Sequence, residues 1–204
     1  MKFKWGEEEQ ETLKLLSKLD IHGKWVNLAC GDGRFMNSLV KRAQVTAFDF
    51  DKNELIDLKK NIKGQYTVKI ADITEQLPFK EIEFDGAFCT GTFHLFYDKM
   101  LDKIFGETKR ILKPTSLFVF DFATDLKRTL PSGKELEDTY FGGDKEPNYT
   151  AAEAKIVIKQ ILKKHGFKLK SMIKAKVPKE ELKYKGQDYT FNCNFWLVEA
   201  KISK

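Results

Sequence analysis

The stretch from Trp25 to Phe35 constrains the fold more than any other part of the chain. A short apolar run leads into Ala29-Cys30-Gly31-Asp32-Gly33, and a helical pattern follows at once. Gly31 and Gly33 allow backbone conformations that a Cβ would forbid, and they let a ligand approach the main chain closely. The helix after such a turn directs free N–H groups and its positive dipole end at the turn. This geometry suits a nucleotide or an amino-acid carboxylate, although many joints of this kind bind nothing.

The length and composition predict one globular domain. The chain has 204 residues, of which 42% are apolar and 32% are charged, enough to bury a substantial core. No apolar run approaches the length of about 20 residues that a membrane span needs, and the charged N-terminus lacks a signal-peptide pattern. The three cysteines form no paired metal spacing. We therefore expect a cytoplasmic protein in a reducing compartment, without a membrane partner.

The net charge of +6 permits an acidic partner but does not require one. Lysine and glutamate alternate along the helical segments and form no basic block, which is typical of a solvated surface.

Strand and helix patterns alternate through five units. Asp51 and Thr150 are predicted helix N-caps, each with a glutamate three residues on that would complete a capping box. The strands are expected over 24–29, 45–49, 67–71, 84–89 and 117–122, and the helices over 7–19, about 33–40, 52–62, 98–112 and 150–165.

The C-terminal third departs from this alternation. Residues 123–149 are polar, contain several glycines and prolines, and are interpreted as a candidate linker or substrate lid within a single domain spanning 1–204. No helix separates 167–177 from 188–202, so these two strands should be antiparallel neighbours joined through 178–187. The predicted fold class is α/β: a doubly wound seven-stranded sheet, mostly parallel, with a terminal antiparallel pair.

Polar residues close successive strands of this sheet. Asp49 ends the second strand, Asp72 follows the third, and Cys89-Thr90 ends the fourth. An acidic residue at the end of the second strand can accept hydrogen bonds from ribose hydroxyls. A structural role as a turn former is the better interpretation of Asp72 taken alone. For Asp49 the ligand role is favoured, because Asp51 already supplies the cap.

A dinucleotide fingerprint would need a third glycine where Met36 stands, which weakens the dehydrogenase alternative. The layout instead resembles the class I S-adenosylmethionine-dependent methyltransferases. The resemblance covers about residues 24–122 by motif and the rest by layout. Its motifs are Val26-Asn27-Leu28-Ala29-Cys30-Gly31-Asp32-Gly33, Val45-Thr46-Ala47-Phe48-Asp49, Ala71-Asp72-Ile73, the run from Leu77 to Cys89, and Arg110-Ile111-Leu112-Lys113-Pro114 before Leu117-Phe118-Val119.

The resemblance implies S-adenosyl-L-methionine as the cofactor and assigns residues to it. The backbone of Ala29, Gly31 and Gly33 would hold the methionine part, and Asp49 the ribose. By the same resemblance, Phe50, Asp72 and Ile73 would contact the adenine and the backbone of Cys89 the amino group, although Phe50 and Ile73 could equally be core residues. The chain departs from the family pattern at Asn27, where an acid is usual, at Ala29, where a glycine is usual, and at Thr115-Ser116.

Methyl transfer from a sulfonium is an in-line displacement that needs alignment and exclusion of water. A general base is needed only if the acceptor keeps its proton at working pH. His94, just beyond the fourth strand, is the only candidate for this catalytic role, and a histidine bonded within the loop is about equally expected.

The residues after the fourth strand, Cys89-Thr90-Gly91-Thr92, lack the Asn-Pro-Pro-aromatic signature of amino-directed nucleic-acid methylation. We therefore expect a small-molecule acceptor, with Tyr140, Phe141 and Tyr149 as candidate lid residues. The alternatives are a tRNA or rRNA methyltransferase that uses the lysine-rich surface, and a non-catalytic binding protein with this fold. The sequence leaves the oligomeric state open.

Overall fold

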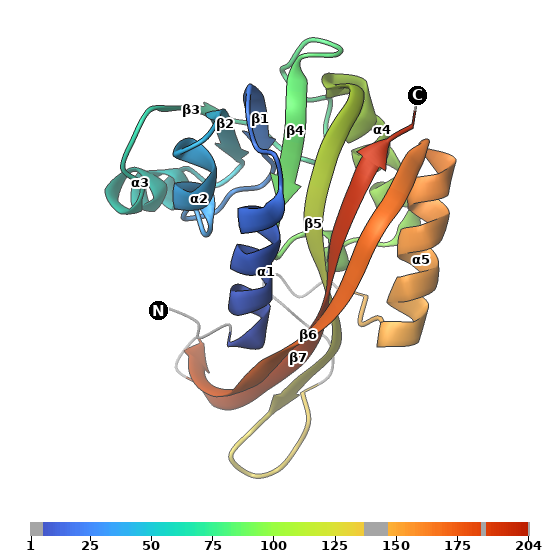
Figure 1. Ribbon diagram of the computed structural model, residues 1–204. Coiled ribbons are helices and arrows are strands. Elements are labelled where there is room, and N and C mark those ends of the chain that lie inside the picture. Colours follow the sequence, from blue (N-terminus) through green and yellow to red (C-terminus); the bar gives the residue numbers. More distant parts are fainter. Residues whose placement is uncertain (1–5, 137–146, 185–186, 204) are drawn as a thin grey trace.

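The computed structural model describes residues 6–136, 147–184 and 187–203. Its elements form three layers, with helices on both faces of one sheet (Figure 1). In chain order they are α1 (Glu7–Lys18), β1 (Lys24–Asn27), α2 (Met36–Val40), β2 (Gln44–Asp49), α3 (Lys52–Asn61), β3 (Tyr66–Ile70), β4 (Phe84–Cys89), the 3₁₀ turn η1 (Phe93–Leu95), α4 (Asp98–Ile111), β5 (Leu112–Thr129), α5 (Ala151–Lys164), β6 (Phe167–Tyr184) and β7 (Gln187–Ile202).

The sheet has seven strands in the order β3-β2-β1-β4-β5-β7-β6. The first five are parallel neighbours, and β7 runs antiparallel to both β5 and β6. The strand order reverses between β1 and β4, and a doubly wound sheet binds its ligand at such a switch point. This arrangement confirms the predicted fold class, including the reversed terminal strand.

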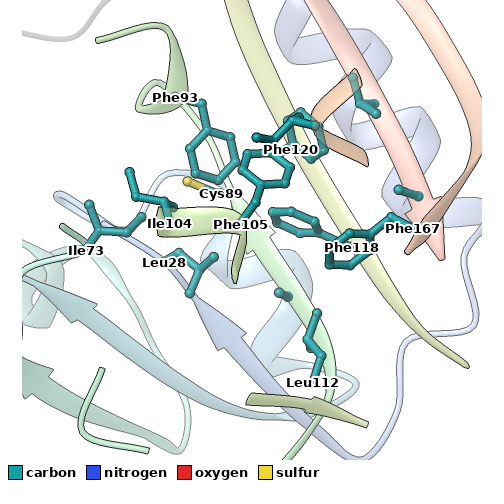
Figure 2. Packing of buried hydrophobic residues seen from close by; sticks show 14 of the residues in the cluster. Leu28, Ile73, Cys89, Phe93, Ile104, Phe105, Leu112, Phe118, Phe120 and Phe167 are labelled. Carbon is teal, nitrogen blue, oxygen red and sulfur yellow. The ribbon is translucent and has the colours of Figure 1, made fainter. Parts of the chain in front are cut away.

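Two apolar layers cover the two faces of the sheet. Helices α1, α2 and α3 pack on one face, where Leu16, Leu39 and Leu58 are fully buried. Helices α4 and α5 pack on the other, around an aromatic cluster that includes Phe93, Phe105, Phe118, Phe120 and Phe167 (Figure 2). Such burial on both faces explains the almost continuous apolar run at residues 117–122 of β5.

Most of the expected helix ends are confirmed. The Asp51 carboxylate accepts from the Asn53 N–H at 2.8 Å and caps α3, but Glu54 forms no capping box. Thr150 and Glu153 form the complete predicted box at the start of α5. Helix α2 begins at Met36 and not near Gly33, because residues 31–35 are used by the turn. Leu13 is largely exposed, so the buried stripe of α1 runs through Leu15 and Leu16 without it.

The strands of the C-terminal third are longer than the sequence indicated. Strand β5 continues through residues 123–129, which were assigned to the lid, because β7 pairs with them as far as Thr129. Strands β6 and β7 likewise run through most of 178–187, which was expected to be a connection. Pairing with a distant strand satisfies backbone groups whatever the polarity of the side chains. The candidate lid residues Tyr140 and Phe141 lie outside the described residues.

Within residues 6–136, 147–184 and 187–203, no helix combines the length and the apolar character that a membrane crossing requires.

Candidate cofactor and acceptor site

The glycine-rich turn stands at the carboxyl end of β1, beside the switch point. Ala29, Gly31 and Gly33 all have positive φ angles, of 45°, 49° and 88°. The Cys30 N–H donates to the Phe48 carbonyl at 2.9 Å and so connects the turn to β2. Because Ala29 adopts a left-handed conformation, a glycine would be the less strained residue there.

The two glycines of the turn have different reasons to lack a side chain. A Cβ on Gly33 would approach Ile62 to 2.8 Å and Leu58 to 3.1 Å, so this glycine allows α3 to pack against the turn. A Cβ on Gly31 would meet nothing nearer than the Glu54 carboxylate, at 3.7 Å. The open space at Gly31 is where a ligand can approach the main chain.

Asp49 connects the glycine turn to the start of α3 through its two carboxylate oxygens. One oxygen accepts from the Gly31 N–H at 2.8 Å, and the other accepts from the Asp51 N–H at 3.0 Å. Each carboxylate oxygen has a second lone pair, so the same group can still accept hydrogen bonds from a diol. The structure therefore brings together Ala29, Gly31, Gly33 and Asp49, as the sequence predicted.

Asn27 presents a buried amide donor at the end of β1. Its side chain is 2% exposed, and its Nδ2 has no hydrogen-bond partner among the described residues. A buried donor without a partner costs free energy, and an anionic group bound in the turn could accept from it.

Acidic groups surround the turn. Burial raises the pKa of the Glu54 carboxyl, and repulsion from Asp32 and Asp49 raises it further. Such a site favours hydroxyl and amino donors and opposes the phosphates of a dinucleotide.

The remaining predicted cofactor residues lie at neighbouring strand ends. Asp72 is exposed and accepts from the Thr74 N–H at 2.8 Å and from the Thr74 hydroxyl at 2.7 Å, which is the turn-forming role. Figure 2 shows Ile73 and Cys89 among the apolar core side chains, and they are 5% and 0% exposed. Phe50, in contrast, is 69% exposed beside Asp49, which excludes a core role.

Cys89 is no nucleophile in this setting. Burial raises the pKa of its thiol well above the usual range, and the nearby Asp121 and Asp49 carboxylates add to this effect. All three cysteines are free and buried.

His94 lies in η1, and its ring is nearly perpendicular to that of Phe195, at an angle of 82° and a centroid separation of 6.5 Å. Burial lowers the pKa of His94 to about 3, and the Arg128 guanidinium contributes to the shift. Its Nδ1 is buried and has no hydrogen-bond partner in the described part of the chain. An imidazole with so low a pKa is a weak base near neutral pH. The burial and low pKa of His94 are reasons against its predicted catalytic role, which stays an untested prediction.

The structure adds three charged residues that the sequence interpretation missed. Glu8 of α1 and Asp121 of β5 are both 0% exposed, and Arg34 of the glycine turn forms a salt bridge with Glu8. The Asp121 Oδ1 accepts from the Gly91 N–H at 2.6 Å. We call Glu8, Arg34 and Asp121 the charged cluster.

Two sequence signals could have identified this cluster. Asp121 interrupts the apolar run of 117–122, where a charge should be costly. Glu8 and Thr12 extend the buried stripe of Leu15 and Leu16 by whole helical turns.

Comparison with known proteins points to the same part of the chain as the glycine turn and the strand ends. Residues 26–120 match the family model described as a methyltransferase domain. A comparison with curated proteins gives no match.

The fold recurs in solved structures at low sequence identity. A protein from Bacillus halodurans, proposed to be a methyltransferase, is 13% identical, with a TM-score of 0.68 over 97% of this chain and 100% of its own. An S-adenosylmethionine-dependent methyltransferase from Mesorhizobium loti is 17% identical, with a TM-score of 0.64 over 96% and 98%. The magnesium protoporphyrin IX methyltransferase of Synechocystis is 15% identical, with a TM-score of 0.64 over 96% and 84%.

Residues 26–120 therefore form a methyltransferase domain within a methyltransferase fold. This match and the recurrence of the fold in solved methyltransferases support the resemblance to the class I S-adenosylmethionine-dependent methyltransferases that the sequence motifs indicated.

Proposed function

We propose that this protein transfers the methyl group of S-adenosylmethionine to a small-molecule acceptor by in-line displacement. The cofactor supplies an activated methyl carbon on a sulfonium. The protein then has to align the acceptor and exclude water.

The described residues fit this cofactor. Asp49 retains acceptor capacity for the ribose hydroxyls, and the space at Gly31 admits the methionine part. The unpartnered Asn27 Nδ2 is a donor for the methionine carboxylate. Phe50 offers an exposed ring for the adenine, and Asp72 and Ile73 lie beyond the neighbouring β3.

A small acceptor is favoured by the burial of polar groups in β5 and in the facing helix α1, and this observation carries this part of the proposal. Glu8, Asp121 and Thr124 are fully buried on the acceptor side. A compact molecule can reach such groups by displacing one side chain, whereas a nucleic acid would need an open, positively charged groove.

Calorimetric titration with S-adenosylmethionine, S-adenosylhomocysteine and NADH tests the cofactor assignment, with Asp49→Ala as the control. We expect micromolar binding of the two adenosyl ligands, lost in the control, and no response to NADH. Heat with NADH alone, or no heat with either adenosyl ligand, would contradict the proposal. Acceptor screening with methyl-labelled cofactor then tests the transfer.

A tRNA or rRNA acceptor is the second candidate, favoured by the exposed lysines of the β6 edge. Lys168, Lys170, Lys174 and Lys176 are exposed there, although lysines also protect an edge strand from pairing with other chains. Filter binding of total tRNA at increasing salt distinguishes the two roles. Tight, steeply salt-dependent binding together with methyl incorporation into the RNA would establish the second candidate in place of the first.

A further inference from the structure

Asp121 is a carboxylate in the interior of the sheet, between Phe120 and Phe122. Its Oδ1 accepts from the Gly91 N–H, whereas its Oδ2 is buried and has no hydrogen-bond partner among the described residues. A buried carboxylate oxygen without a partner is expensive to maintain. Its position therefore calls for a ligand that donates a hydrogen bond or a positive charge.

The location of Asp121 places that ligand beside the cofactor. Cys89, the last residue of β4, pairs with Phe120, so Asp121 lies one position beyond the end of β4. The Gly91 N–H that it binds belongs to the turn directly after β4. Ligands of doubly wound sheets bind at this edge, near the switch point.

The groups that face Asp121 leave it short of positive charge. Glu8 approaches from α1, and Arg34 from the glycine turn is a cation that acts on both carboxyl groups. Burial raises the pKa of Glu8 and Asp121, and the Arg34 guanidinium opposes the shift. On β7, Cys193 is close enough for all three members of the charged cluster, and for Arg128, to influence the pKa of its thiol. Two buried carboxyl groups thus share the positive charge of Arg34.

Arg34 is the member of the charged cluster nearest to solvent. Its side chain is 19% exposed, against 0% for that of Glu8, and its guanidinium lies 4.3 Å from the centre of the Phe35 ring. The residues on either side of it, Gly33 and Phe35, have φ angles of 88° and 64°. A cation that enters from solvent would therefore meet the acidic pair where the guanidinium now lies.

We propose that the methyl acceptor is a compact alkylamine whose ammonium group binds at Asp121 Oδ2, with Asp121 as the base that takes the proton from it. This inference rests on the proposed function and names the acceptor class for the same site. Asp121 is a catalytic residue in this scheme because it touches the reacting nitrogen.

The reaction balances as follows. The ammonium R–NH₃⁺ gives one proton to the Asp121 carboxylate and becomes a neutral amine. The nitrogen lone pair forms the new N–CH₃ bond while the CH₃–S bond breaks and its electron pair goes to sulfur. The products are R–NH₂–CH₃⁺ and S-adenosylhomocysteine, and Asp121 then releases its proton to solvent. The neighbouring sulfonium charge favours the deprotonation step, since it repels the ammonium form.

Other acceptor classes match the charged cluster less well. A carboxylate or phosphate acceptor would be repelled by Glu8 and Asp121. An alcohol could donate a hydrogen bond to Asp121. It brings no positive charge, however, so one of the two carboxylates, Glu8 or Asp121, would stay without a compensating charge.

The test is a panel of acceptors that carry the same phenethyl group, namely phenethylamine, phenethyl alcohol and phenylpropionic acid, with further small alkylamines beside them, assayed with methyl-labelled cofactor. We expect methylation of amines alone. Asp121→Asn should lower kcat with the amine by about 100-fold or more, the usual contribution of a general base, while the affinity for S-adenosylhomocysteine stays within a few-fold of wild type.

The pH profile distinguishes a base from a structural residue. The residual rate of Asp121→Asn should rise about tenfold per pH unit up to the pKa of the amine, near 10 as for lysine, whereas the wild-type rate should be much flatter. Asp57→Asn, an exposed change on α3, is the matched control. Glu8→Gln is the second variant, and it should raise KM for the amine with little change in kcat.

The outcomes separate the two proposals. Methylation of the alcohol or the acid but not the amine, with the cofactor bound, would overturn this inference alone. Absence of turnover of every amine with the cofactor bound, or an Asp121→Asn enzyme with a wild-type rate and pH profile, would do the same. Failure to bind either adenosyl ligand would overturn the proposed function.

Discussion

The two halves of the carboxyl edge of the sheet differ in how well their polar groups are hydrogen-bonded. At β1 and β2, both oxygens of Asp49 bind backbone N–H groups, and the turn is held in position by main-chain bonds. In β5 and in the turn after β4, Asp121 Oδ2 and His94 Nδ1 are buried without hydrogen-bond partners among the described residues. The first half is a preformed site. In the second half, buried polar atoms without hydrogen-bond partners can be paired by a bound acceptor.

This difference follows from what each half has to do. A cofactor that is shared across a family needs a fixed binding site, which backbone groups supply at little entropic cost on binding. Acceptors differ from enzyme to enzyme, so their recognition depends on individual side chains such as Glu8 and Asp121.

The largest expected effect is a difference between Asp49 and Asp121 in how strongly their substitution weakens cofactor binding. Asp49→Ala removes the proposed acceptor of the ribose hydroxyls, the bond to the Gly31 N–H and the bond to the Asp51 N–H, so we expect it to weaken S-adenosylhomocysteine binding by about 100-fold, or ~2.7 kcal/mol. Asp121→Asn should leave that affinity nearly unchanged. Calorimetry on both variants measures the contrast, and an equal loss in both would remove the distinction between the halves.

The glycines provide a second contrast, in stability. Gly33→Ala combines a positive φ with a contact of 2.8 Å to Ile62, and we expect it to cost about 3 kcal/mol. Gly91→Ala has no neighbour within 4 Å of the added Cβ and should cost only about 1 kcal/mol. Urea unfolding compares them, and similar costs would show that the turn tolerates displacement of α3.

The pH dependence of stability sharpens the comparison further. Asp121 and Glu8 have folded-state pKa values above their ordinary values of 3.8 and 4.5. The folded state therefore holds more protons than the unfolded state above these values, and stability falls as pH rises through the window. Asp121→Asn should flatten this fall by about 1 kcal/mol or more between pH 4 and 7, as measured by unfolding at a series of pH values. A steeper fall in the variant would contradict the assigned charge state.

The smallest expected effect concerns left-handed residues. Ala29→Gly should stabilise the protein by about 0.5 kcal/mol, because relief of the strained φ of 45° exceeds the added chain entropy. Asp125 has a similar φ of 53°, but its carboxylate accepts from Asn194 at 2.9 Å, so Asp125→Gly should be destabilising. Thermal unfolding of the pair tests this, and a gain in both variants would mean that the Asp125 bonds contribute little.

The sequence predicted the parallel half of the fold because its strands and helices are marked by their own periodicity, and α3 also by its Asp51 cap. It did not predict the length of β5, since residues 123–129 are polar and become a strand only through pairing with β7. The same local patterns identified Asp49, which is the last residue of its strand. It missed Glu8 and Asp121, because their meeting depends on how α1 packs over the sheet.

The first helix is attached to the last hairpin: the Glu7 carboxylate accepts from the Lys176 N–H at 3.0 Å. The charged cluster and its neighbour Cys193 bring together residues that are far apart in sequence, namely 8, 34, 121 and 193. The glycine turn and its hydrogen bonds, in contrast, lie within residues 27–51. Contacts this far apart in sequence form late, since the intervening chain must first be ordered. During synthesis the cofactor half can fold while the C-terminal hairpin is still unmade, and the enzyme becomes selective for its acceptor only when the last strand is in place. Pulse-labelled hydrogen exchange during refolding should show protection of β1 and β2 before β7, and the reverse order would refute this sequence of events.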